Sequence, residues 1–430
     1  MLFAIKKETF HNILINLYLN ELMVSKKVII VGGGFGGIFT YLNLHKLTHK
    51  NKLVSFTVIS DKNYFLFTPL LPEVSSGVLF PEDIITPVRE NITCCMDGFI
   101  LGRVDYIDSK SNTLKVGEKI VNFDYLVVAS GASINYRNID GAKKYSIPFK
   151  TLDDSILLKN SLIDLFEKDE LIKDACDINI LIVGGGPTGI EVGVEVSQLI
   201  DELLPFYTKL NRDFHNIDIK ILNSSSDFLK GFPEKIKKYV LDNFGKNIPI
   251  DIVFNAHVIR VDKDTVYLED GKSLNYDILI WSAGVSPNII KMDKSYALSD
   301  TGRYLTTKYL NLKDKENIFT IGDVADIENM NLPMLAQTAT DQSKICAINI
   351  LNSIEGNPLL EFKLHQKGLL LSLGKRNAVA QIGNKFFTKK IAWVIWKLFY
   401  LSEIFGKGSK IKIVFNWILN EFSPRDISKI

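Results

Sequence analysis

The chain of 430 residues has few cysteines, no long apolar run and almost no net charge. Its cysteines form neither a CxxC pair nor a metal-ligand spacing, which argues against a dithiol reductase and a metal site and fits a reducing compartment. They are Cys94, Cys95, Cys176 and Cys346. No uninterrupted apolar run reaches the ~18–20 residues that a membrane-spanning helix needs, so the chain is not expected to cross a bilayer. A net charge of +2 gives no case for nucleic-acid binding.

The chain is longer than one ordinary core requires, so two or three domains are expected. The first 23 residues lack arginine and carry Glu8 and Glu21, which speaks against a targeting peptide. We interpret them as a peripheral extension, or as an early start ahead of Met23.

A pattern of apolar run, glycine turn and helix occurs twice, as VIIVGGGFGGIFTYLN at 28–43 and ILIVGGGPTGIEVGVE at 180–195. The spacing G-x-G-x-x-G is met by Gly32, Gly34 and Gly37, and again by Gly184, Gly186 and Gly189. The first glycine makes a tight turn, the second lets the backbone approach a pyrophosphate, and the third allows close packing of helix on strand. Because both copies lie between strand and helix, the sequence predicts two dinucleotide sites.

Further apolar runs extend each copy into a sheet. Strands are expected at 53–60 and 123–132 for the first copy, and at 217–223 and 276–285 for the second. A later run at 317–325 is assigned to the first sheet, with the second domain inserted between its halves. The predicted fold class is therefore α/β, with two Rossmann-like dinucleotide-binding domains.

Two dinucleotide sites suggest a resident flavin and a visiting nicotinamide, since hydride passes between stacked rings. Gly322 and Asp323 end the late strand, where the carboxylate can accept hydrogen bonds from the ribitol hydroxyls of FAD; alternatively it caps the next helix. The expected parts are an extension (1–23), an FAD-binding domain (24–132 and 286–360), an inserted NAD(P)H-binding domain (133–285) and a C-terminal membrane-association region (361–430).

Six segments then form a set: NYFLFTPLLPEVSSG at 63–77, FDYLVVASGA, GGGPTGIEVGVE, WSAGV, IGDVA and LPMLAQTATDQ. With them, and with its tail, the chain resembles the type II NADH dehydrogenases, the single-subunit, non-pumping NADH:quinone oxidoreductases. The resemblance runs from about Lys27 to the C-terminus.

The resemblance implies FAD in the first domain, NADH at the second, a membrane quinone as electron acceptor, and no metal. The residues implied for FAD are Gly32, Gly34, Phe35, Gly36, Gly37, Ser60, Asp61, Thr68, Pro69, Leu70, Ala129, Ser130, Gly131, Asp323 and Ala336. Those implied for the nicotinamide nucleotide are Gly184, Gly186, Pro187, Thr188, Gly189, Asn223, Ala283 and Gly284. Those implied for the quinone are Gln337, Thr340 and Asp341.

The TPLLP segment and the helix after Pro333 receive specific roles from the resemblance. Thr68 to Leu71 would lie along the isoalloxazine, whereas Pro69 and Pro72 by themselves predict an extended loop. The helix starting near Ala336 would point its N-terminal dipole at the flavin and stabilise the reduced ring, and Gln337 would border the quinone pocket.

The chain departs from the family at two places. The motif A-Q-x-A-x-Q meets Asp341, and Gln342 stands one place later, roughly 100° around the helix. The second position of the motif could therefore be a quinone contact or a solvated helix residue, and the sequence leaves both alternatives open. Where an NADH-specific enzyme presents an acid to the ribose, the chain has Asn223 followed by serines, so NADPH is a second possible substrate. In the first copy the equivalent contact falls to Ser60 or Asp61.

The quinone step needs protons, and Glu191 is the candidate to relay them. We expect it on the first turn of the second domain's helix, facing the junction of the two dinucleotides. The alternative is a structural role, as a negative charge favourably placed near a helix N-terminus.

The tail is aromatic and basic, with nine lysines and arginines against three acids from Lys385 onward. Two amphipathic helices, separated by Gly406 and Gly408, predict a peripheral attachment to a lipid surface. The expected lipid contacts are Trp393, Trp396, Phe399, Tyr400 and Trp417. The alternative is packing on the protein itself or on a partner in a homodimer. The expected location is the cytoplasmic face of a bacterial inner membrane, ahead of the mitochondrial inner membrane.

Two other functions share this fold class. A sulfide:quinone oxidoreductase would need a redox cysteine pair near the flavin and usually lacks an intact second glycine motif, which is complete here. A nucleotide-sensing flavoprotein of the apoptosis-inducing-factor kind would react slowly and act through protein contacts. The sequence favours the respiratory enzyme, with the quinone and the oligomeric state left open.

Overall fold

The structure is a computed structural model that describes residues 25–48, 54–91, 98–167, 176–208, 214–294, 296–330, 332–364 and 368–429. The predictions for residues 1–23 and for Cys94 and Cys95 lie outside these ranges. The chain divides into two compact units. Unit 1 comprises 1–65, 87–132 and 287–365, and unit 2 comprises 66–86, 133–286 and 366–430.

Unit 1 is built on an eight-stranded sheet in the order β24-β21-β22-β23-β9-β1-β2-β5. Its centre is β1 (Lys26–Val31), which pairs in parallel with β2 (Val54–Ser60) and β9 (Tyr125–Val128). β23 (Lys315–Thr320) also pairs in parallel with β9, so the strand expected at 317–325 belongs to this sheet. The remaining strands are β5 (Gly98–Leu101), β21 (Tyr304–Thr306), β22 (Asn311–Leu312) and β24 (Ala325–Ile327).

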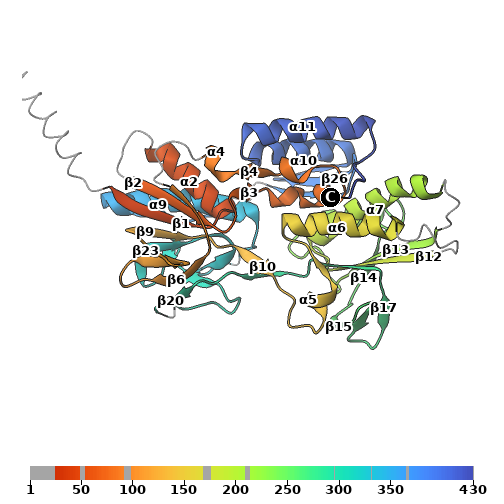
Figure 1. The fold of residues 1–430 in the computed structure, drawn as a ribbon, viewed down its shortest axis with the longest axis horizontal. Coiled ribbons are helices and arrows are strands. Elements are labelled where there is room, and N and C mark those ends of the chain that lie inside the picture. Colours follow the sequence, from red (N-terminus) through yellow and green to blue (C-terminus); the bar gives the residue numbers. More distant parts are fainter. Residues whose placement is uncertain are drawn as a thin grey trace, which may run out of the picture. The chain divides into compact units, whose positions relative to one another are not determined.

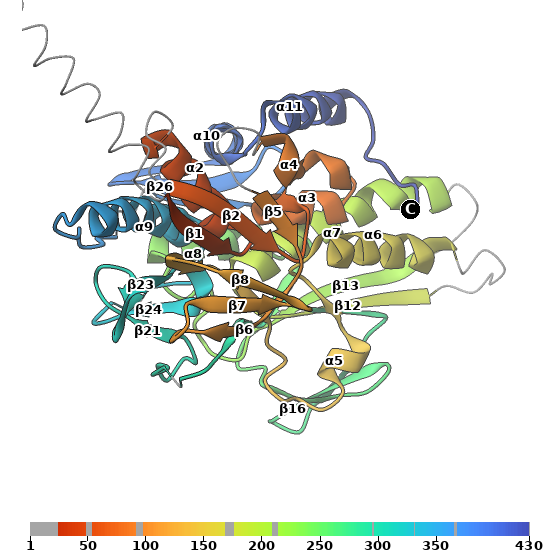
Figure 2. The same ribbon diagram turned by 60° about the vertical axis from the view of Figure 1, so that its left-hand side comes forward.

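The two faces of this sheet are covered differently, because successive side chains of a strand point to opposite sides. Ile29 and Val31 pack in one core with the antiparallel strands β6 (Val104–Asp108) and β7 (Thr113–Val116). Ile30 points to the other face, against Gly37 of α2 (Phe35–Thr48). α2 packs beside α9 (Ala336–Glu355), as the views in Figures 1 and 2 show.

Unit 2 repeats this design with a parallel five-stranded sheet in the order β11-β18-β12-β13-β14. On one face lies the antiparallel group β15 (Val258–Val261), β16 (Thr265–Leu268) and β17 (Ser273–Asn275). On the other, Gly193 of α7 (Pro187–Thr208) sits over Ile182 and Ile221. The five strands are β11 (Ile147–Pro148), β12 (Cys176–Val183), β13 (Phe214–Leu222), β14 (Asp251–Val253) and β18 (Ile278–Trp281). The α/β class and the inserted second Rossmann-like domain are therefore confirmed.

Residues 66–86 belong to unit 2 and contain the TPLLP segment. The prediction of an extended loop here is wrong, because Thr68–Leu70 forms a 3-10 helix and Leu71–Ser75 forms α3. Pro69 and Pro72 each stand in the first turn of their helix, where the ring sets the required φ and the missing N–H costs nothing. α3 packs against α6 (Leu152–Glu167) and α7.

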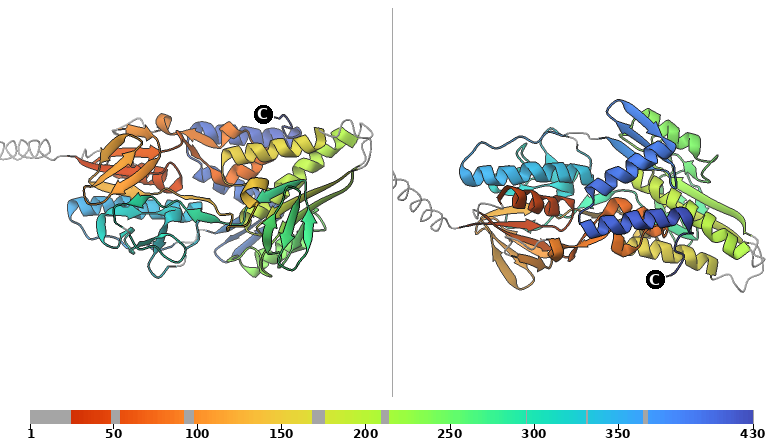
Figure 3. Two further views of the ribbon diagram at one scale, coloured as in Figure 1. Left: turned by 60° about the horizontal axis from the view of Figure 1, so that its bottom comes forward. Right: turned by 90° about the horizontal axis from the view of Figure 1, so that it is seen from above.

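The C-terminal part of unit 2 joins a small sheet to two helices. β25 (Leu369–Ser372), β26 (Ala378–Ile382) and β27 (Lys385–Thr388) form an antiparallel meander, and α10 (Lys389–Glu403) packs on it. α11 (Lys407–Phe422) follows after Gly406, and both helices are seen from above in Figure 3. Among the described residues no helix has both the length and the apolarity needed to cross a bilayer.

Short elements complete the described parts of both units. They are β3 (Tyr64–Leu66), η2 (Pro81–Asp83), β4 (Ile85–Pro87), α4 (Val88–Asn91), β8 (Lys119–Asn122), β10 (Ala132–Ile134), α5 (Ala142–Tyr145), α8 (Glu234–Asn243), β19 (Val285–Pro287), β20 (Lys291–Met292) and η4 (Gly322–Val324).

Candidate functional site

The two glycine turns have the same local geometry. Gly32 and Gly184 each adopt φ +121°, which side chains other than glycine rarely take. A Cβ on Gly37 would lie 1.9 Å from the carbonyl oxygen of Gly32, and one on Gly189 would lie 1.9 Å from that of Gly184. The first and third glycines of each motif are therefore required by the backbone itself.

The middle glycines differ, because a Cβ on Gly34 or Gly186 would meet nothing within 4 Å. Each opens onto space at the start of a helix, since α2 begins at Phe35 and α7 at Pro187. The unpaired backbone N–H groups and the positive end of the helix dipole there suit an anionic group. Both turns thus fit the pyrophosphate of a dinucleotide. Phe35, Pro187 and Thr188 lie at these openings, whereas Gly36 is buried and faces Ala129 and Ile321.

The residue that ends each second strand packs inward, on the middle of the glycine run. Ser60 is 6 % exposed, and its hydroxyl oxygen would lie 2.5 Å from a Cβ on Gly33. Asn223 is 8 % exposed, with its Oδ1 at 2.5 Å from a Cβ on Gly185. Its Nδ2 donates to the carbonyl of Ser225 at 2.7 Å.

The next residue of each copy, Asp61 or Ser224, is exposed instead. In both copies this following position, rather than Ser60 or Asn223, has a side chain that is open to a ribose. Sequence reasoning placed both pairs together but could not separate an inward from an outward residue.

The residues that follow β9 in unit 1 and β18 in unit 2 are hydrogen-bonded to another segment of the same unit. In unit 1 the Ser130 hydroxyl donates to the carbonyl of Asn288 at 2.7 Å, and the Asn288 N–H donates to Gly131 at 2.8 Å. In unit 2 the Arg137 side chain donates to the carbonyl of Ala283 at 3.1 Å. Gly284, at φ +104°, and Ala129 complete these strand ends. The predicted loops are thus present at the carboxyl edges, where Rossmann sheets bind nucleotides.

Asp323 stands in the 3-10 turn Gly322–Val324, and a glutamine holds that turn. The N–H of Gly322, at φ +72°, donates to Gln342 Oε1 at 2.6 Å, and Gln342 is 1 % exposed. The interpretation of Gln342 as a solvated helix residue is therefore wrong. Its position one place beyond the family's motif turns its side chain into unit 1, where it pairs with the Asp323 turn.

The start of α9 is at Ala336, as predicted. Ala336 and Gln337 are partly exposed there. Thr340 is 4 % exposed and its hydroxyl donates to the carbonyl of Ala336 at 2.9 Å, so it serves the helix. Asp341 lies 3.7 Å from the ammonium of Lys344. Of the residues expected at the quinone, Thr340 is buried, and Gln337 and Asp341 are partly exposed.

Glu191 lies on the second turn of α7, since the helix begins at Pro187, and the prediction of a first-turn position is wrong. This position argues against the structural role at the helix N-terminus, because the stabilisation of a negative charge by the helix dipole fades beyond the first turn. Glu191 Oε1 accepts the N–H of Ser372 at 3.0 Å. Burial is the main cause that raises the pKa of Glu191 to about 8. The hydrogen bond from the Ser372 N–H lowers this pKa, and the charges of Glu195 and Glu73 raise it further.

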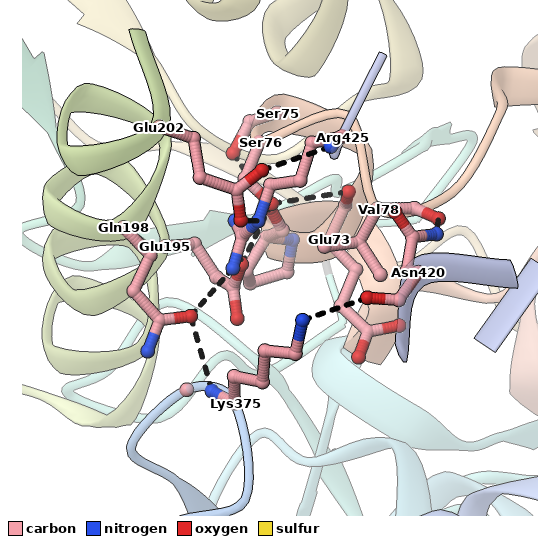
Figure 4. A network of polar contacts seen from close by, with 12 residues as sticks. Glu73, Ser75, Ser76, Val78, Glu195, Gln198, Glu202, Lys375, Asn420 and Arg425 are labelled. Atoms are coloured by element: carbon pink, nitrogen blue, oxygen red, sulfur yellow. Dashed lines mark hydrogen bonds and ion pairs between the residues drawn. The ribbon is translucent and has the colours of Figure 1, made fainter. Parts of the chain in front are cut away.

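A polar network around Glu195 and Arg425 was not foreseen from the sequence (Figure 4). Glu195 Oε2 accepts the Ser76 hydroxyl at 2.6 Å and Arg425 Nη1 at 2.7 Å. Arg425 also binds Glu202, with its backbone N–H at 2.8 Å and its Nε at 3.2 Å. The motif pointed to Glu191 because it belongs to the glycine turn, whereas Arg425 lies far away along the chain.

The TPLLP residues lie in the same unit as this network. Thr68 and Pro69 are partly exposed, and Leu70 is fully buried. Phe67 packs edge-on against Tyr400 of α10, with ring centroids 5.9 Å apart. The tail helices therefore support the segment that the resemblance places at the flavin.

Two of the predicted lipid contacts are wrong. Trp396 is 2 % exposed and Trp417 is 6 % exposed, so both side chains belong to the core of unit 2. Trp393, Phe399 and Tyr400 are partly buried. The indole of a tryptophan buries more apolar area than any other side chain, and here the protein itself takes that area up.

A different face of the two helices is exposed. On α10 it carries Ile391, Val394 and Leu398, and on α11 Ile411, Phe415, Ile418 and Phe422. Their spacing of three and four residues puts each set on one side of its helix. No group of acidic, histidine and cysteine side chains suited to a metal occurs in the described residues.

Comparison with known proteins agrees with this geometry. The chain is 29 % identical over 426 residues to a probable NADH dehydrogenase of Dictyostelium discoideum. That match covers 95 % of this chain and 92 % of the other protein. It is 27 % identical over 425 residues to a type II NADH:quinone oxidoreductase of Mycobacterium tuberculosis, covering 93 % and 89 %. These matches confirm the resemblance found in the sequence.

Among solved structures, NDH2 of Plasmodium falciparum in complex with NADH shares the fold, with a TM-score of 0.84 at 22 % identity. That match covers 94 % of this chain and all of that chain. The model of the pyridine nucleotide-disulphide oxidoreductase family matches residues 26–343, which include both glycine turns and the Asp323 turn. The chain therefore belongs to the pyridine nucleotide-disulphide oxidoreductase family.

Proposed function

We propose that the protein is an NADH:quinone oxidoreductase that uses FAD and pumps no protons. The observation that carries this proposal is the pair of matching glycine turns, one in each unit, together with the protonated acid Glu191 beside the second turn. The relatives named as NADH:quinone oxidoreductases, matched over nearly their whole length, support the same activity.

The residues of unit 1 suit FAD. The pyrophosphate would lie at Gly34 and the start of α2, a ribose hydroxyl at the exposed Asp61, and the ribitol at Asp323. NADH would lie at Gly186 and the start of α7, with Ala283 and Gly284 at the strand end beside it. FAD held by these residues would supply the chemistry of hydride acceptance from NADH and electron transfer to the quinone.

The residues of the chain would supply one proton per turnover. Reduction of a quinone to its quinol consumes two electrons and two protons, and a hydride brings only one proton. The other comes from solvent. Glu191 holds such a proton on its carboxyl group at neutral pH, since burial raises its pKa to about 8. We propose that Glu191 delivers it and that Gln337 borders the quinone.

Anaerobic stopped-flow measurement of the two half-reactions tests the proposal. NADH should bleach the flavin absorbance, and a quinone analogue should restore it. Reduction by NADH without reoxidation by any ubiquinone or menaquinone analogue would refute the quinone step and favour the nucleotide-sensing alternative. Flavin reduction by sulfide would favour a sulfide:quinone oxidoreductase.

We further propose that the exposed row on α10 and α11 attaches the protein to an anionic lipid bilayer. Phe415 and Phe422 are 61 % and 88 % exposed, and Lys390, Lys407 and Lys412 are exposed on the same two helices. Apolar side chains flanked by lysines match the chemistry of an anionic interface. In a bacterium this would be the cytoplasmic face of the inner membrane.

Vesicle sedimentation with and without anionic lipid tests the attachment. Phe415→Glu should weaken binding roughly tenfold, because one buried aromatic side chain contributes ~1.5–3 kcal/mol. Ile120→Glu is the matched control, since Ile120 is 72 % exposed on β8 of unit 1 and should leave binding unchanged. Unchanged vesicle binding in Phe415→Glu, with a dimer converted to a monomer, would assign this face to a homodimer instead.

A further inference from the structure

Unit 2 contains a second buried acid that the proposed function does not use. Glu73, on α3, is 7 % exposed, and its Oε2 accepts the indole N–H of Trp417 at 2.7 Å. Burying a carboxylate that accepts one neutral hydrogen bond is costly, so such a group tends to keep its proton.

Charged and titratable groups face Glu73 from each element that packs around it. From α7 come Glu191 and Glu195, from α10 Lys397 and Tyr400, and from the chain's last residues Arg425. α6, which packs on α3, carries Lys159, and the Lys159 ammonium forms an ion pair with Asp426 at 2.9 Å.

Lys397 is a second cation, besides Arg425, that acts on Glu73. Its ammonium lies 3.8 Å from the ring centroid of Trp393 and 4.7 Å from that of Trp417. Burial lowers the pKa of Lys397, so its charge does not fully compensate the acid.

Glu195 is the member of this group that pairs with an arginine. It is 5 % exposed, and Arg425 and the Ser76 hydroxyl both donate to its Oε2. An arginine is always charged in a protein, and a buried arginine of this kind requires a carboxylate as partner. The Arg425 and Glu195 side chains are 4 % and 7 % exposed, which keeps water from screening the pair.

The fixed negative charge of Glu195 acts on both neighbouring acids. Burial raises the pKa of Glu73 to about 7, with Lys397 opposing and Glu195 adding to the rise. Glu191 responds to the same two carboxyl groups, Glu195 and Glu73. Two buried acids, of which Glu73 raises the pKa of Glu191, therefore hold protons in the range in which an enzyme works.

We propose that Glu73 is a second proton-holding acid that reloads Glu191 after each quinone is reduced, with the Glu195–Arg425 ion pair as the fixed charge beside both. This inference rests on the proposed quinone step. In each turnover Glu191 gives one proton from its carboxyl group and becomes a carboxylate. Glu73 then gives its own proton to Glu191 and is reprotonated from solvent, so the protons balance. Glu73 acts through Glu191 and touches no substrate.

The rival role for Glu73 is structural, as the acceptor that ties α11 to α3 through Trp417. The variant Glu73→Gln separates the two roles, because the amide oxygen of glutamine can still accept the Trp417 N–H while the group cannot carry a proton. Glu202→Gln is the matched control. Glu202 also binds Arg425, but its side chain is 28 % exposed, so solvent screens its charge.

The first measurement is infrared difference spectroscopy of the holoenzyme between acid and alkaline pH. In the Glu191→Gln background one protonated carboxyl band should remain and titrate near pH 7, and it should disappear in the double variant with Glu73→Gln. This readout needs no substrate and does not depend on turnover. If no carboxyl band titrates there, the inference is refuted.

The second measurement compares the two half-reactions as a function of pH. Glu73→Gln should slow flavin reoxidation by quinone at least roughly tenfold under repeated turnover and change its pH profile, as expected for loss of a proton-transfer group. Flavin reduction by NADH should stay within about twofold, and Glu202→Gln should behave as wild type. A wild-type pH profile in Glu73→Gln, with only a lowered melting temperature, would make Glu73 structural. Failure of wild-type protein to reduce any quinone would overturn the proposed function itself.

Discussion

Replacement of Glu191 by glutamine should affect stability and quinone reduction together, and in opposite directions. Folding favours the protonated form of this acid, because burial is the chief cause that raises its pKa from 4.5 to about 8. Below pH 4.5 the group is protonated in both the folded and unfolded states and contributes nothing to the pH dependence. Between 4.5 and 8 only the unfolded state releases the proton, so the free energy of unfolding falls as pH rises.

The size of this effect follows from the shift. Each pKa unit corresponds to ~1.4 kcal/mol, and pH 7 lies about 2.5 units above the unfolded-state pKa of 4.5, which gives an upper limit of roughly 3–4 kcal/mol. Coupling to Glu73 and Glu195 spreads the titration, so we expect Glu191→Gln to gain roughly 1–3 kcal/mol at pH 7 and nothing at pH 4. The glutamine oxygen can still accept the Ser372 N–H.

The assay is chemical denaturation of the holoenzyme at several pH values, paired with stopped-flow kinetics. The variant should show a flatter dependence of stability on pH, flavin reduction within about twofold of wild type, and quinone reduction slowed by roughly 10²–10⁴. An equal loss in both half-reactions would show that Glu191 shapes the nucleotide site instead. A pH dependence of stability identical to wild type would refute the burial argument.

Other substitutions test other parts of the two sites. Ser224→Asp should lower kcat/KM for NADPH at least roughly tenfold and leave that for NADH nearly unchanged, because a carboxylate there would repel a 2′-phosphate, whereas Asn223→Asp should mainly lower the melting temperature. Steady-state kinetics with both nucleotides decides this. Gln342→Leu should leave the Gly322 N–H unpaired, at a cost of ~1–3 kcal/mol, and raise the dissociation constant of FAD, measured by flavin fluorescence. Equal FAD affinity in Gln342→Leu and wild type would remove Gln342 from the flavin site.

The glycine turns were predictable from sequence because their geometry is dictated locally. A strand followed by a glycine that must adopt φ +121° leaves few alternatives for the next turn, and this holds identically at Gly32 and Gly184. The strand at 317–325 was assigned correctly for a similar reason, since an apolar strand of that length must pair inside a sheet. The sequence could not show that Ser60 and Asn223 point inward while the residues after them point outward. One step along an extended backbone turns the side chain to the opposite face of the sheet.

The tail was predictable in kind but not in detail. Its aromatic residues and lysines indicated amphipathic helices, yet α10 has apolar residues on more than one side. The sequence cannot say which side the protein buries. Trp396 and Trp417 pack inward because unit 2 offers them partners, including Tyr400 at 4.7 Å from Trp396, and the aliphatic row is left exposed.

The distance along the chain between Glu195 and Arg425 explains why the network around Glu195 was not foreseen from the sequence, and it also suggests what the tail does. The strap from Ser423 to Lys429 returns from α11 to the rest of unit 2 through four ion pairs, at Glu195, Glu202, Lys159 and Asp164. Arg425 thereby supplies from the tail the ion-pair partner of Glu195, and Glu195 in turn favours the proton on Glu191 and Glu73. A tail that served only for attachment would need no buried arginine, since exposed lysines suffice for an anionic surface. The position of Arg425 therefore links the segment proposed to bind lipid to the protonation of the acids proposed to serve the quinone.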